Sequence, residues 1–184
     1  MFRSLAVVVL AVGVARADVE SGPKAGDKVG ELKAFGVVGK VEGKEADFAA
    51  ERKGQPTVYL FVNADKFSRP MNQFIKTLDG KLTGIDAKAA AVAVWLTADA
   101  DKSKEFLPKV QMSVKYESTA LAVLGDTSGP KGWGVNPDAH LTVVVVSADG
   151  TVAKAFAYES VNGTDAKAVE EALRKALKKA VEKK

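Results

Sequence analysis

Three stretches of the chain are apolar throughout and rich in strand-forming residues. They are TVYLFV at 57–62, AAAVAVWL at 89–96 and LTVVVV at 141–146. A strand with one face in water alternates apolar and polar residues, whereas a strand covered on both faces is apolar along its length. These runs therefore predict the centre of a sheet with other elements packed against both of its faces.

Amphipathic helices are predicted around these strands. Pro70 marks the start of the first helix, because proline suits the first helical turn. Asp99 and Asp101 stand where an N-cap belongs, ahead of a second helix that runs to about Met112. A third helix is predicted from Asp165. The expected inner faces are Met71, Phe74, Ile75 and Leu78 in the first helix, Phe106, Leu107 and Val110 in the second, and Val169, Leu173, Leu177 and Val181 in the third.

Turn signals complete a mixed sheet. GKVEG separates two short segments, Leu32 to Val38 and Glu45 to Phe48, and SADG separates LTVVVV from 151–158, so each turn predicts a hairpin. A further short strand is expected at 121–124. It is followed by a loop of 16 residues, 125–140, with four glycines and two prolines. The order predicts an α/β domain with a mixed central sheet, an N-terminal β-hairpin extension and flanking helices.

The first 17 residues have the pattern of a signal peptide. Arg3 supplies the positive charge, Leu5 to Val14 is an apolar stretch of ten residues, and Ala15 to Ala17 fits a small-x-small cleavage site. Ten residues are too few to span a bilayer, which needs about 20. The expected division is a signal peptide at 1–17 and one domain at 18–184. The mature protein is expected to be exported, periplasmic or extracellular, with no integral membrane segment.

Composition excludes several classes of function. The chain has no cysteine, so it cannot form a disulfide and its packing alone must stabilise it. The formal charge is +4, and removal of the leader, with two arginines and no acid, lowers it to +2. That charge is too small to indicate a nucleic-acid partner. One histidine and no cysteine exclude the usual zinc ligand sets, and no metal or other cofactor is expected.

The strand–loop–helix junction around residue 67 resembles that of a known superfamily. An N-terminal segment and a predicted hairpin with glycine in its turn come before KGQPTVYLF. Phe67 follows, directly before Ser68, Arg69, Pro70 and Met71. With the element order, this resembles the thioredoxin-like superfamily and its redoxin and peroxiredoxin-like branch, in which an aromatic residue precedes Cys-Gly-Pro-Cys. The aromatic residue and the proline match, whereas both cysteine positions differ.

A second mark of that superfamily is a cis-proline before a threonine, facing the cysteine pair. The equivalent residues here are expected to be Leu141 and Thr142, after His140. A cis bond before a residue other than proline costs about 2.5–4 kcal/mol, so a trans bond is expected at Leu141. The resemblance implies the fold, while the missing cysteines remove support for thiol–disulfide exchange and for peroxidase activity.

Two hypotheses about the function of this junction remain open. In the first, the chain is a binding or interaction module without thiol redox activity, and its partner is an unknown protein, peptide or small anionic ligand. In the second, it is an enzyme of non-thiol chemistry in which Ser68 pairs with His140 and with Asp65 or Asp138. Ser68 as a helix cap is the simpler interpretation, and a name such as thiol peroxidase would then rest on family resemblance alone. No catalytic residue is assigned.

The predicted binding face combines the junction with the segments expected opposite it. Arg69, on the first turn of a helix, would favour an anion. Trp133 is either a packing anchor for the long loop or an exposed contact residue. The predicted face consists of Phe67, Ser68, Arg69, Pro70, Trp133, His140 and Leu141.

Overall fold

A seven-stranded mixed sheet forms the centre of the computed structural model, which describes residues 19–182, with side chains described to residue 178. The predicted leader at 1–17 lies outside these residues. The strand order is β2-β1-β5-β4-β3-β6-β7. The strands are β1 (Lys33–Val38), β2 (Glu45–Asp47), β3 (Thr57–Asn63), β4 (Ala90–Leu96), β5 (Thr119–Leu124), β6 (Leu141–Val146) and β7 (Val152–Tyr158).

The pairing of the strands confirms the predicted mixed sheet. Strands β3, β4 and β5 are parallel, and the two connections between them carry helices. The other neighbours are antiparallel, including the predicted hairpins β1–β2 and β6–β7. Strand β5 begins at Thr119, two residues before the predicted start, because Thr119 pairs with Ala91 of β4.

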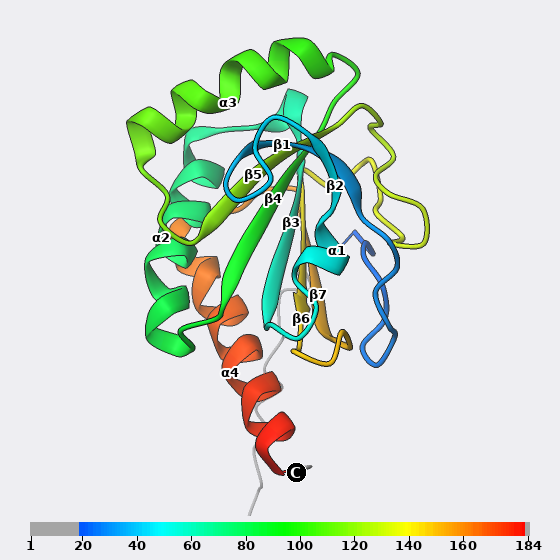
Figure 1. Ribbon diagram of the computed structural model, residues 1–184, viewed down its shortest axis with the longest axis vertical. Helices are drawn as coiled ribbons and strands as arrows, with labels where there is room; N and C mark the ends of the chain where they lie inside the picture. The colour runs from blue at the N-terminus through cyan, green and yellow to red at the C-terminus, as the bar shows by residue number, and fades with distance from the viewer. Residues whose placement is uncertain (1–18, 183–184) are drawn as a thin grey trace, which may run out of the picture.

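Helices cover one face of the sheet and shorter elements cover the other (Figure 1). Helices α2 (Arg69–Ile85), α3 (Ala100–Val114) and α4 (Ala166–Glu182) pack on the first face, and the four-residue α1 (Phe48–Glu51) packs on the second. Two short 3-10 helices, η1 (Ala64–Lys66) and η2 (Gly163–Asp165), precede α2 and α4. Of the helices within 19–182, none combines the length and apolarity that a membrane crossing requires.

The helix boundaries follow from their caps. Ser68 caps α2, which begins at Arg69, one residue before the predicted start, and Asp99 caps α3 as predicted. The inner stripe of α3 is Ser103, Leu107 and Val110, at i, i+4 and i+7. Phe106 lies at the edge of this stripe and is 42% exposed, so its predicted place on the inner face is wrong. The side chain of Val181 lies outside the described residues.

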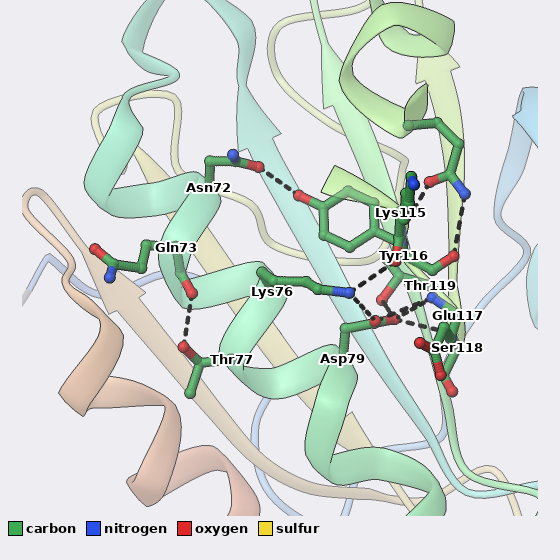
Figure 2. Close-up of polar contacts among 11 residues, drawn as sticks. Asn72, Gln73, Lys76, Thr77, Asp79, Lys115, Tyr116, Glu117, Ser118 and Thr119 are labelled. Carbon is green, nitrogen blue, oxygen red and sulfur yellow. Dashed lines mark hydrogen bonds and ion pairs between the residues drawn. The ribbon is translucent and has the colours of Figure 1, made fainter. Parts of the chain in front are cut away.

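A buried carboxylate ties α2 to the start of β5 (Figure 2). Asp79 is 2% exposed. Its oxygens accept hydrogen bonds from the backbone amides of Glu117 at 3.0 Å and Ser118 at 2.8 Å, and from the hydroxyl of Thr119 at 2.8 Å. The ammonium of Lys76, one turn earlier, lies 3.5 Å from Asp79. The carboxylate thus satisfies the buried hydroxyl of Thr119 and two partly buried backbone amides.

Neighbouring bonds hold the turn between α3 and β5 in place. Lys115 adopts a left-handed conformation, with φ of 55°, and its carbonyl accepts from the ammonium of Lys76 at 2.7 Å. The side chain of Gln111 bonds both backbone groups of Tyr116. The hydroxyl of Tyr116 donates to Oδ1 of Asn72 at 2.5 Å. Burial, and then the charge of Asp79, raises the pKa of Tyr116, so its hydroxyl remains a donor at neutral pH.

Replacing the buried carboxylate tests this connection. Asp79→Ala should lower the free energy of unfolding by about 3 kcal/mol, because one buried and two partly buried donors lose a charged acceptor. The measurement is urea unfolding followed by far-UV circular dichroism. Asp138→Ala is the control, since the Asp138 carboxylate is exposed and makes no hydrogen bond within the described chain. A loss for Asp79→Ala no larger than that of the control would contradict the assignment.

Candidate functional site

The junction between β3 and α2 is a short, well-ordered turn. Asn63 ends β3 and caps η1, accepting from the amide of Asp65. Ser68 is extended, and its Oγ accepts a hydrogen bond from the amide of Met71 at 3.4 Å. Arg69 and Pro70 are exposed on the first turn of α2. The interpretation of Ser68 as a helix cap is therefore confirmed.

Leu141 is the first residue of the neighbouring strand β6 and His140 directly precedes it, and both are held by backbone bonds. The amide of His140 donates to the carbonyl of Tyr158 at 2.9 Å, and its carbonyl accepts from Asn63 at 3.1 Å. Leu141 is fully buried and pairs with Val62. All peptide bonds within the described residues are trans, which confirms the prediction for Leu141. No hydrogen bond joins Ser68 to His140 in this part of the chain.

Trp133 lies on the opposite face of the sheet from α2. Its side chain is fully buried, with ring centroids 5.0 Å from Tyr59 and 5.1 Å from Phe61. Its indole N–H donates to the carbonyl of Glu31 at 3.1 Å. Alternation along β3 sends Tyr59 and Phe61 to this face and Leu60 and Val62 to the helix face. Trp133 is the packing anchor of the long loop, and its predicted place on one face with Ser68 is wrong.

The structure contains a groove that the sequence did not reveal, at the carboxyl ends of β3 and β4. It has a volume of about 490 Å³. Phe67 lies at its centre, with its ring 5.1 Å from Trp95 and 6.1 Å from Phe106. We call this the aromatic groove. Its lining residues are Ala64, Asp65, Phe67, Trp95, Thr97, Ala98, Asp99, Lys102, Ser103, Glu105, Phe106 and Lys109.

Charges of both signs surround the aromatic groove. Lys102 and Lys109 come from α3, at i−4 and i+3 from Phe106, while Asp65 and Glu105 supply carboxylates. None of these four charged side chains forms an ion pair or hydrogen bond within the described chain. The carboxylate of Asp99 is occupied as the cap of α3, accepting from the amide of Lys102 at 3.0 Å.

One of the predicted site residues, Phe67, lines this groove. Ser68, Arg69 and Pro70 are exposed beside it, His140 is half-buried just before β6, and Trp133 and Leu141 are buried. The lysines and Phe106 were missed because their spacing on α3 also suits an ordinary solvated face. Ligands of open α/β sheets bind outside the carboxyl ends of the parallel strands. This rule could have located the groove from the sequence. Within residues 19–182, no group of three or more histidine, aspartate and glutamate side chains could hold a metal ion.

Comparison with known proteins gives a fold and no close relative. No protein-family model matches the chain, and no curated protein matches its sequence. Solved structures do match. A crystal structure assigned as the thiol:disulfide interchange protein DsbE of Chlorobium tepidum has a TM-score of 0.64 at 19% identity, covering 84% of this chain and 98% of its own.

Two further structures agree with this match. A peroxiredoxin-like protein from Aquifex aeolicus has a TM-score of 0.57 at 13% identity, covering 86% of this chain and 91% of its own. Peroxidoxin BcpB from Mycobacterium tuberculosis has a TM-score of 0.57 at 17% identity, covering 82% and 96%. These neighbours are redoxin and peroxiredoxin-type proteins, so the thioredoxin-like fold predicted from the resemblance is confirmed.

A cysteine placed at the cap tests whether the junction keeps the electrostatics of a thiol site. In Ser68→Cys, the N-terminus of α2 should lower the thiol pKa from about 8.5 toward about 7.5. Ser113→Cys, in the last turn of α3, is the matched control, and its pKa should stay at or above about 8.5. Ultraviolet absorbance of the thiolate during a pH titration measures both. Equal pKa values would show that the cap position has no such effect.

Proposed function

We propose that this protein is an exported binding module of thioredoxin-like fold, without thiol redox activity, that holds an extended peptide segment in the aromatic groove. The observation that carries the proposal is the Phe67–Phe106 pair. Phe106 leaves 42% of its surface in water although it touches an aromatic neighbour. An exposed aromatic side chain beside a concave, partly apolar surface is typical of a binding site.

The absence of cysteine supports the part of the proposal that excludes thiol redox chemistry. Thiol–disulfide exchange needs a thiolate, and the chain has none to offer. The hydroxyl of Ser68 is engaged in capping α2, and no contact with His140 supplies a base. No observation therefore favours the Ser68–His140 enzyme.

The composition of the groove favours a peptide over a simple anion. Its floor is aromatic, which suits an inserted aromatic or large aliphatic side chain. Its rim carries two free lysines and two free carboxylates, which together match a chain bearing both charges and backbone polar groups better than a single phosphate or carboxylate. A volume of about 490 Å³ accommodates a few side chains of such a segment.

Peptide selection tests the proposal. A phage-displayed random peptide library selected on residues 18–184 should yield peptides that share an aromatic or large aliphatic residue. Phe106→Ala should weaken the selected peptides by about 30-fold, or about 2 kcal/mol, because it removes a central aromatic anchor. Titration calorimetry measures affinity. In a Trp133→Phe background, Trp95 is the sole tryptophan and its fluorescence reports directly on the groove.

Met112→Ala is the matched control for Phe106→Ala. Met112 is on the same helix and is 69% exposed, yet it lies outside the groove. Its replacement should leave peptide affinity unchanged, and both variants should remain folded at the temperature of the binding measurement. Failure to select any peptide, or equal losses in the two variants, would reject the groove as the binding surface.

The proposal that the protein is exported rests on its first 17 residues. Their charged start, apolar stretch and Ala15-Arg16-Ala17 motif have the pattern of a cleaved leader. A domain that is stable without disulfides is compatible with an oxidising compartment, since it has no thiol to oxidise.

Amino-terminal sequencing tests export. When the full chain is expressed in a bacterial host, the extracytoplasmic protein should begin at Asp18. Ala17→Trp should block processing, because the cleavage site requires a small residue. Protein that remains in the cytoplasm and begins at Met1 would contradict both the leader and the localisation, without bearing on the peptide groove.

A further inference from the structure

One of the four asparagines of the chain is followed by glycine. The residues that follow Asn63, Asn72 and Asn136 are alanine, glutamine and proline, and Gly163 follows Asn162. Cyclisation of an asparagine side chain requires attack by the backbone nitrogen of the next residue. Glycine permits that attack best, because it has no Cβ to crowd the ring. Proline has no N–H and cannot take part in this way.

The fold exposes Asn162 and polarises its side-chain amide. Asn162 is solvent-exposed and extended, with φ of −136° and ψ of 173°. Its Oδ1 accepts from the amide of Thr164 at 2.9 Å and from the Thr164 hydroxyl at 2.5 Å. Two donors on this oxygen would stabilise the negative charge that develops there when Cγ is attacked. The amide of Gly163 makes no hydrogen bond within the described chain, so its nitrogen is not held by another acceptor.

We propose that Asn162 is a site of spontaneous deamidation. The Gly163 nitrogen loses its proton and attacks Cγ of Asn162, forming a C–N bond, and Nδ2 leaves as ammonia. The resulting cyclic imide then takes up one water, which opens either of its two carbonyls. The products are aspartate and isoaspartate, and the net reaction exchanges the amide for a carboxylate with uptake of water and release of ammonia.

The two products would act differently on α4. Asn162 and Asp165 form a capping box before this helix, in which Asp165 accepts from the amide of Asn162 at 2.9 Å. Aspartate keeps the acceptor and adds a negative charge near a helix N-terminus, which is favourable. In isoaspartate the main chain continues through the side-chain carbonyl, so the capping box cannot form. Val161 and Ala166, on either side, are buried in the core, so that product should loosen the attachment of α4.

Ageing the intact protein tests the proposal. The folded chain is incubated at mildly alkaline pH and physiological temperature, and the tryptic peptide 155–167 is analysed by mass spectrometry. It should gain the mass of an amide-to-acid change and separate into two products, while peptides containing the other three asparagines stay unchanged. The aged sample should also melt at a lower temperature in proportion to its isoaspartate content.

Gly163→Ala is the matched variant. Its added Cβ would meet Thr77 and Gln73 of α2 at 3.5 and 3.7 Å, which are ordinary contacts, and the Gly163 φ lies outside the left-handed region. The variant should fold normally and lose the conversion. Thr164→Val, which removes one donor from Oδ1, should slow the conversion.

Three results would overturn the proposal. They are an unchanged Asn162 in the folded chain, equal conversion in Gly163→Ala, and conversion at Asn63 or Asn72 as fast as at Asn162.

Discussion

Strand β3 is buried on both faces, and the arrangement of the whole molecule depends on that constraint. Alternate side chains enter two separate cores, with Leu60 and Val62 under the helices and Tyr59 and Phe61 under α1 and the long loop. Its parallel pairing with β4 and antiparallel pairing with β6 fix which strand ends meet at the edge where α2 begins. A residue that belongs to one core cannot reach the other face. This separation places Trp133 in the core with Tyr59 and Phe61, and it places Phe67 against the core under the helices.

The fold could be predicted from the sequence because its signals are local and repeated. Continuous apolar runs identified β3, β4 and β6, and the turn signals identified both hairpins. The site could not be predicted to the same extent, because it depends on which face each loop residue reaches. Trp133 is separated from Tyr59 by more than seventy positions, and no periodicity connects them. Asp79 was missed for the same reason, since its partners stand on another element and give no pattern on α2.

The Asp79 cluster and the aromatic groove both involve helix α3 or its connections. Asp79 fixes the turn that leads from α3 into β5, while Phe106 and the two lysines come from 102–109, within α3 itself. Helix α3 buries three of its residues, so its position depends strongly on its connections at each end. The cap at Asp99 and the turn at Lys115 supply those connections. The wall of the groove is therefore positioned by polar contacts at both ends of α3, one of which, the Asp99 cap, belongs to the groove lining itself.

A frame of this kind can be stable without cysteine. A thiol site needs one thiolate at a helix N-terminus, whereas the fold itself does not, because the hydroxyl of Ser68 caps α2. Binding depends instead on the apolar surface that a partner can cover. Complete burial of a phenylalanine side chain is worth about 1.5–3 kcal/mol, and Phe106 leaves part of that unrealised in the free protein. An occupant that covers Phe106 recovers this free energy together with the contact to Phe67. In the proposed function, recognition would use the edge of the sheet at which the carboxyl ends of β3 and β4 meet.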